Sequence, residues 1–121
     1  MGKRGRKRAK AGGAAAAPVA VSEYRDGEGN VLALRDELSA GTLTGLERLD
    51  AKPAANAEDR WQRRVEYLFE RLAVRWEIAG LPLEGQRELL GRYRMASPDE
   101  RRAVRAALAE HLAGRYPDVE I

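Results

Sequence analysis

The strongest constraint on the fold is the apolar pattern between Trp61 and Ala79, where large side chains recur at intervals of three and four residues. On a helical wheel these side chains fall on one face. They are Trp61, Val65, Leu68, Phe69, Leu72, Trp76 and Ala79. Such a face is typical of a helix that packs against a hydrophobic core. We therefore predict one long helix over residues 57–79.

Signals for helix ends frame this pattern and predict two further helices. Asn56 is followed by an acidic residue three positions later, which resembles a capping box, and the GLP run at 80–82 is typical of a helix end. The apolar spacing that follows predicts a helix over 83–95. The SPDE run at 97–100 then predicts a capped helix over 98–114.

The apolar residues upstream predict one or two short helices. A helix over 31–38 would begin after Asn30 as its N-cap, and a second short helix over 43–49 would follow. The turn-forming DGEGN run at 26–30 also permits a small β-hairpin, which is the lesser alternative. With three main helices and these short ones, the predicted fold class is all-α, a small helical bundle.

Positive charge is concentrated at the start of the chain. Six of the 22 basic residues lie within the first ten positions, and the remaining 16 are set against 19 acidic residues. The six are Lys3, Arg4, Arg6, Lys7, Arg8 and Lys10. Ordering such a segment would cost conformational entropy without burying apolar surface. We therefore predict a disordered basic and alanine-rich arm over 1–18, and one helical domain over 19–121 that is net acidic.

The basic arm allows weak attachment to nucleic acid, because clustered cations release counterions from a phosphate backbone. Contact through residues 1–10 would be non-specific, since the arm contains no aromatic side chain that stacks on a base. A solubilising tail explains the same composition equally well. The sequence leaves both interpretations of the arm open.

Few residues offer catalytic or metal-binding chemistry. The chain has no cysteine, and His111 is its single histidine. His111 shares the apolar stripe of the last predicted helix, which favours a structural role over that of a general base. The sequence also lacks a glycine-rich phosphate loop. We therefore predict no enzyme activity, no catalytic residue, no metal and no cofactor.

A second, narrower stripe on the predicted 57–79 helix is the candidate partner-binding surface. It consists of Tyr67, Val74 and Ile78, next to the acidic residues Glu66 and Glu70. The stripe is either a second core face or an exposed patch for a protein partner. The expected function is that of a small non-enzymatic interaction or regulatory protein, which binds a larger protein through its helical body as a monomer or homodimer. The alternative is a nucleic-acid-associated protein that attaches through the arm.

No stretch of the sequence is apolar enough for a membrane span. The longest weakly apolar run, 14–21, is rich in alanine, contains Pro18 and is well short of about 20 residues. The same run lacks the large apolar residues of a signal peptide. We therefore expect a cytoplasmic protein that does not contact membranes.

Overall fold

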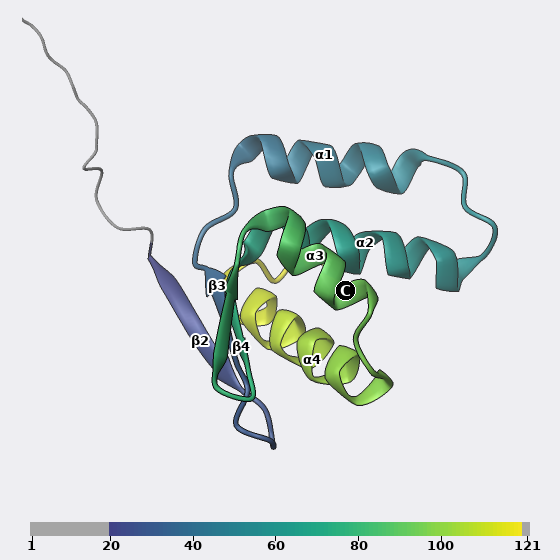
Figure 1. The fold of residues 1–121 in the computed structure, drawn as a ribbon. Helices are drawn as coiled ribbons and strands as arrows, with labels where there is room; N and C mark the ends of the chain where they lie inside the picture. Colours follow the sequence, from purple (N-terminus) through teal and green to yellow (C-terminus); the bar gives the residue numbers. More distant parts are fainter. Residues whose placement is uncertain (1–19, 120–121) are drawn as a thin grey trace, which may run out of the picture.

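A four-stranded antiparallel sheet forms one layer of the fold, so the prediction of an all-α helical bundle is wrong. The computed structural model describes residues 20–119. Within them the chain forms four strands and four helices, which makes the fold α+β. Figure 1 shows the sheet on one side of the molecule and the helices on the other. The arm predicted over 1–18 lies outside the described residues.

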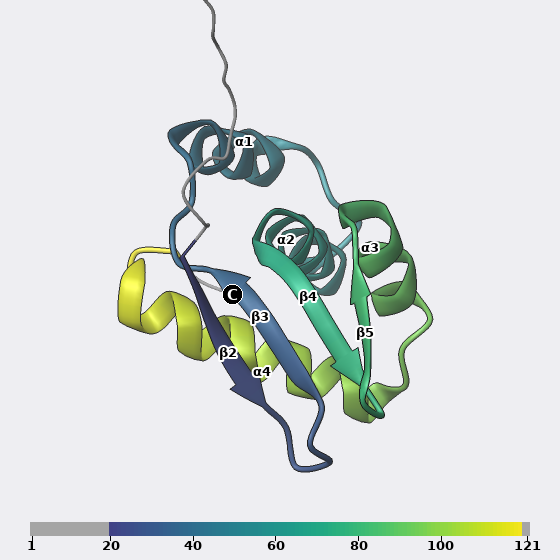
Figure 2. The ribbon, with the colours of Figure 1, turned by 60° about the vertical axis from the view of Figure 1, so that its left-hand side comes forward.

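The strands follow one another across the sheet in the same order as in the sequence. β2 (Val21–Arg25) and β3 (Val31–Arg35) form one hairpin, and β4 (Ala73–Ile78) and β5 (Leu81–Glu84) form the other. The two hairpins join through antiparallel pairing of β3 with β4. β2 and β5 are therefore the two edges of the sheet, as Figure 2 shows.

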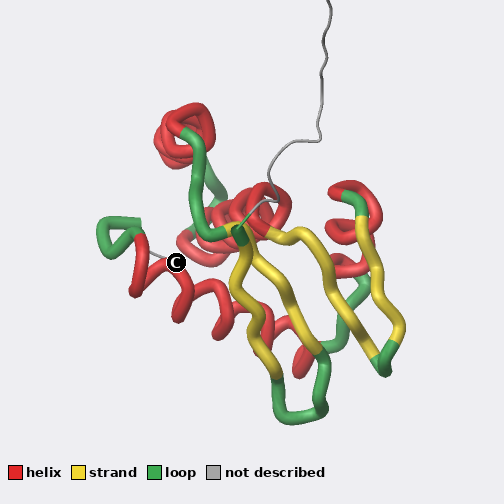
Figure 3. Tube along the Cα trace, turned by 90° about the vertical axis from the view of Figure 1, so that its left-hand side faces the viewer, coloured by secondary structure: helices red, strands yellow, loops and turns green. Residues whose placement is uncertain are grey.

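Three of the four helices in residues 20–119 lie along one face of the sheet, and the first helix packs on the second. α1 (Ala40–Ala51) and α2 (Ala57–Leu72) connect the two hairpins, whereas α3 (Gln86–Arg94) and α4 (Pro98–Arg115) follow the second hairpin. α1 packs on α2, and α4 lies against β3. Figures 2 and 3 show α4 crossing behind β2 and β3, with its C-terminal turns extending past the β2 edge.

Asp26 and Asn30 explain why a hairpin forms where the sequence predicts a helix start. The Asp26 carboxylate accepts hydrogen bonds from the backbone N–H groups of Glu28 and Asn30, at 2.8 and 3.0 Å, and from the Asn30 side chain at 2.9 Å. Gly29 adopts a φ of 83°, which glycine reaches without strain. Asn30 is thus part of a turn rather than a helix cap, and the lesser alternative of a hairpin is correct.

The long helix predicted over 57–79 ends at Leu72, and the chain continues as strand β4. The strand then turns back within two residues. Ala79 and Gly80 have φ values of 54° and 79°, the pair of positive values that a type I′ turn requires. The Ala79 N–H donates to the Asn30 side chain at 3.1 Å, so the turn of one hairpin stabilises the turn of the other.

The helix predicted over 83–95 is shorter than expected, because its first residues pair with β4 as part of β5. Gly85, with a φ of 101°, separates β5 from α3. By contrast, the capped helix predicted over 98–114 is confirmed as α4. The Ser97 hydroxyl accepts from the Glu100 N–H at 3.1 Å, and the Glu100 carboxylate accepts from the Ser97 N–H at 2.9 Å.

Two upstream helix predictions have opposite outcomes. The short helix predicted over 43–49 exists within α1, which begins at Ser39 as its N-cap. The helix predicted over 31–38 is wrong, because most of this segment is strand β3. At the start of α2 the sequence signal holds, since the Asn56 side chain accepts from the Asp59 N–H at 2.8 Å.

The core lies between the sheet and the helices. Phe69 of α2 contacts the rings of Trp76 from β4 and Tyr93 from α3, with centroid distances of 5.8 and 5.0 Å. Trp76 lies opposite Leu32 on one neighbouring strand and Leu83 on the other. This row of inward-facing side chains fixes both hairpins to the helical layer.

The outer face of the sheet is charged. Arg75 of β4 forms ion pairs with Glu23 of β2 and, at 3.2 Å, with Glu77. These long side chains lie across the strands from Val31 and Ala33, which are buried although no helix covers this face in the described part of the chain. The aliphatic stems of the charged residues therefore shield the apolar residues between them.

Candidate functional site

The predicted partner-binding stripe is not a single surface, because its residues lie on different elements. Tyr67 belongs to α2, whereas Val74 and Ile78 belong to β4. Tyr67 and Ile78 are half-buried and pack against the core. Val74 is half-buried next to the register shift between β3 and β4. The continuous helix that would have aligned the three side chains is absent.

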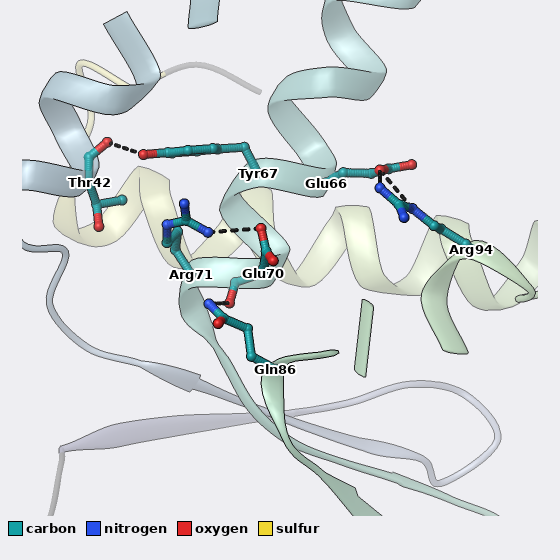
Figure 4. Close-up of polar contacts among 7 residues, drawn as sticks. All are labelled: Thr42, Glu66, Tyr67, Glu70, Arg71, Gln86 and Arg94. Carbon is teal, nitrogen blue, oxygen red and sulfur yellow. Dashed lines mark hydrogen bonds and ion pairs between the residues drawn. The ribbon is translucent and has the colours of Figure 1, made fainter. Parts of the chain in front are cut away.

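Tyr67 attaches α1 to α2. Its hydroxyl donates to the backbone carbonyl of Thr42 at 2.9 Å, as Figure 4 shows, and the Arg71 guanidinium lies 4.6 Å from the centre of its ring. Gly45 provides the space for this contact, since a Cβ atom there would lie 2.1 Å from the Tyr67 hydroxyl oxygen. Tyr67 therefore has a structural role between two helices.

Glu66 and Glu70 connect α2 with neighbouring parts of the chain. The Glu66 carboxylate accepts from Nε and Nη2 of Arg94 on α3, at 3.1 and 2.8 Å, and this hydrogen bonding raises the pKa of Arg94. Glu70 pairs with Arg71 at 2.8 Å, and its backbone carbonyl accepts from the Gln86 side chain at 3.0 Å (Figure 4). Both carboxylates are thus engaged within the chain.

His111 is buried and holds α4 against the first hairpin. Its Nε2 lies 2.7 Å from the backbone carbonyl oxygen of Arg35, which can only accept a hydrogen bond, so Nε2 is the donor. Its Nδ1 lies 2.8 Å from the hydroxyl of Tyr24. Since both ring nitrogens are engaged inside the fold, the structural role predicted for His111 is confirmed.

In the part of the chain that the structure describes, no strand pairs with the outer edge of β2, which we call the open edge. At one end of the hairpin the Ala20 carbonyl accepts from the Asp36 N–H, and at the other end the Asp26 N–H donates to the Asn30 carbonyl. Because backbone groups alternate in direction along a strand, the even-numbered residues of β2 point their N–H and C=O groups toward β3. The odd-numbered residues point theirs outward. They are Val21, Glu23 and Arg25. Within residues 20–119 no hydrogen bond is found for the outward N–H and C=O groups of these residues.

A pocket of about 270 Å³ lies between the turn of the first hairpin and α4, and its lining extends from Tyr24 of β2 to Trp76 of β4. Tyr24 and Arg25 are the lining residues that β2 contributes. Its floor is apolar and combines Leu32, Trp76, Val104 and Ala107. On the α4 side the pocket is lined by Ala103 and Ala106, whose short side chains leave the space open.

Carboxylates surround the pocket. The Asp26 carboxylate is engaged in the turn of the first hairpin. Glu100 caps α4 and forms an ion pair with Arg92 at 2.9 Å. The hydrogen bond from Arg92 lowers the pKa of Glu100, and the hydrogen bond from the Ser97 backbone lowers it further. Within residues 20–119 no hydrogen bond or ion pair is found for the Glu110 carboxylate. Burial, followed by the negative charge of Glu110, raises the pKa of Tyr24. In the pocket lining, acidic residues therefore outnumber basic residues.

The open edge of β2 and the pocket between the hairpin turn and α4 are together called the groove. The sequence contains only a weak signal for it. Ala103, Ala106 and Glu110 recur at helical spacing beside the buried stripe of α4. Their proximity to the β2–β3 turn depends on strands that the helical interpretation did not include. The groove was therefore missed, although α4 itself was predicted.

The other predicted sites are not brought together in the described part of the chain. In residues 20–119 no group of three or more His, Cys, Asp or Glu side chains is placed to hold a metal ion. No helix in this range is long and apolar enough to cross a membrane. The predicted nucleic-acid contacts lie outside it: Lys3, Arg4, Arg6, Lys7, Arg8 and Lys10.

Comparison with known proteins identifies no relative. The chain matches no protein-family model, and neither the curated proteins nor the solved structures contain a significant match.

Proposed function

We propose that the protein is a small cytoplasmic, non-enzymatic interaction protein that binds an extended segment of a larger protein along the open edge of β2. The observation that carries this proposal is the row of outward N–H and C=O groups at Val21, Glu23 and Arg25, without partners in residues 20–119. An extended segment placed beside them adds a strand to the sheet. Main-chain hydrogen bonds then supply affinity, and side-chain pockets supply specificity.

Two features distinguish β2 from the other edge of the sheet. The residues that flank the tight turn at 79–80, Ile78 and Leu81, form a hydrogen-bonded pair. The next residue of β5, Pro82, therefore faces outward, and proline has no N–H group to offer to another strand. β2 contains no proline and is one residue longer than β5. An added strand is therefore supported at β2 and disfavoured at β5.

Substitution of one outward residue tests the proposal. Glu23→Pro removes an N–H group that faces solvent and leaves the bonds between β2 and β3 intact. Glu23→Ala is the matched control, because it removes the same ion pair with Arg75 but keeps the N–H group. We expect wild type and Glu23→Ala to capture the same partner from a nuclease-treated lysate, and Glu23→Pro to lose it. Equal capture by all three proteins would contradict strand addition at β2.

A second candidate function rests on the six cations of the first ten residues. Attachment of this arm to DNA or RNA would be weak, salt-sensitive and independent of nucleotide sequence. The outer face of the sheet offers no support for base stacking, because Tyr24 and Trp76 face the helices. Deletion of residues 1–13 is expected to abolish retention on nucleic acid. Unchanged retention after the deletion would exclude this function.

A further inference from the structure

We infer that the pocket beside β2 accepts a lysine or arginine side chain from the segment that pairs with this strand. The inference rests on the proposed function, since it specifies which kind of segment the open edge binds. Three properties of the pocket support it: its position relative to an added strand, its apolar floor and the charge at its rim.

The position follows from strand geometry. Side chains of an added strand alternate between the two faces of the sheet, so every second one points toward the helical layer. The C-terminal turns of α4 extend past this edge, as Figures 2 and 3 show, so they lie beneath the place that the added strand would occupy. Among the α4 residues that line the pocket, Glu110 is the one nearest in sequence to these turns. The inward side chain beside Tyr24 therefore approaches the pocket from the side that Tyr24 and Glu110 line.

The apolar floor suits the long methylene stem of a basic side chain. Leu32, Trp76 and Val104 are almost fully buried, and the pocket floor that they form is made mainly of aliphatic and aromatic carbon. Lysine and arginine bury their stems on such surfaces while the charged end reaches polar groups. The chain shows the same chemistry next to the pocket, where the Arg92 guanidinium lies 5.5 Å from the ring centre of Trp76 and pairs with Glu100.

The charge at the rim selects the sign of the ligand. The acidic residues of the pocket lining are Asp26, Glu100 and Glu110, and the one basic residue described there is Arg25. Arg25 alternates with the inward-facing Tyr24, so its side chain belongs to the outer face of the sheet. Because Asp26 and Glu100 are engaged in the turn and the helix cap, Glu110 is the carboxylate left to pair with an incoming cation.

Short synthetic peptides of alternating threonine and valine, labelled with fluorescein, test this inference on the full chain. The panel differs at one central position, which is arginine, lysine, norleucine or glutamate. We expect the arginine and lysine peptides to bind about tenfold more tightly than the norleucine peptide, as for a charge-assisted hydrogen bond in a partly enclosed site. The basic arm attracts acidic peptides, so the dependence of binding on Glu110 is the deciding measurement.

Matched variants separate the pocket from the rest of the surface. Glu110→Gln is expected to weaken binding of the arginine peptide about fivefold and to leave binding of the norleucine peptide unchanged. Glu47 is an exposed glutamate on α1, and the control substitution Glu47→Gln is expected to change the binding of neither peptide. Ala106→Leu fills the pocket and weakens the arginine peptide. Ala109→Leu makes the same change at an exposed position of α4 outside the pocket lining and has no effect.

The outcomes distinguish this inference from the proposed function. If all four peptides bind equally and Glu23→Pro abolishes their binding, strand addition stands and selection of a basic side chain is overturned. If the arginine preference is present but does not change in Glu110→Gln and Ala106→Leu, the pocket is not its cause and the inference fails. Absence of binding by every peptide contradicts both the basic-side-chain pocket and strand addition.

Discussion

The two edge strands of the sheet, β2 and β5, differ in the turn that joins each of them to its neighbour and in the features that block pairing with a further strand. The β2 hairpin has a longer turn that side chains stabilise, through Asp26 and Asn30, whereas the β5 hairpin has a two-residue turn that backbone angles at Ala79 and Gly80 define. β5 also carries Pro82 and packs against α3. Natural proteins commonly protect sheet edges in these ways. The contrast teaches that β2, which within residues 20–119 has neither a proline nor a strand on its outer side, is the feature that needs a functional explanation.

The largest effect is expected from the row of side chains that fixes both edges to the core. Trp76→Ala removes an almost fully buried ring that contacts Phe69 and lies opposite Leu32 and Leu83. We expect a loss of about 3–5 kcal/mol in the free energy of unfolding, measured by urea denaturation. Both hairpins should lose amide protection together. Persistence of one hairpin in hydrogen exchange would show that the edges are independent units.

Proline substitutions at adjacent positions of β2 test which backbone groups face outward. Ser22→Pro removes an N–H group that points to β3, and it is expected to cost about 1–3 kcal/mol of stability. Glu23→Pro removes an outward N–H group, so its cost should be close to that of Glu23→Ala. Thermal unfolding of the three variants provides the comparison. A reversed order would mean that β2 has the opposite register.

Restoring an N–H group at the other edge tests whether Pro82 protects it. Pro82→Thr gives β5 an outward donor and a residue of high β-propensity. We expect little change in stability but a concentration-dependent increase in self-association, measured by sedimentation velocity. Leu81→Thr in the same strand is the control, because it changes a side chain and creates no new N–H group. Equal behaviour of both variants would remove the protective role of Pro82.

The smallest effect concerns the acidic rim of the groove. The folded state lowers the pKa of Glu100 through its bonds with Arg92 and Ser97, so this contribution to stability is present above the ordinary glutamate pKa and is lost as the pH falls through the lowered value. The pair is partly exposed, and its contribution should stay below about 1 kcal/mol. Urea denaturation at neutral and acidic pH should show a smaller pH dependence for Glu100→Gln than for wild type.

Parts of this protein follow from short-range sequence signals alone. Ser97 and Glu100 form their capping box within one helical turn, and Asn56 caps α2 in the same local way. These interactions need no distant partner, so the starts of α2 and α4 were predictable. The buried position of His111 followed equally well from the apolar stripe of α4.

The strands depended on contacts that are distant in the sequence. Trp76 fits the apolar face of a helix that continues from α2, yet it faces the core equally well from a short strand. Whether this segment forms a strand or a helix depends on the pairing of Trp76 with Leu32, a residue far away in the chain. It also depends on the hydrogen bond that the Ala79 N–H donates to the Asn30 side chain. Short apolar runs are ambiguous between helix and strand when only periodicity is considered. For this reason the sheet was missed.

The sequence by itself determined where two helices begin, that His111 lies on the buried stripe of α4 and how charge divides between the first ten residues and the rest of the chain. Tertiary structure alone decided that Tyr67, Val74 and Ile78 separate onto a helix and a strand, and that the edge of β2 lies beside Glu110 of α4. Local signals act over one helical turn, whereas a sheet edge and a groove exist only when segments distant in sequence meet.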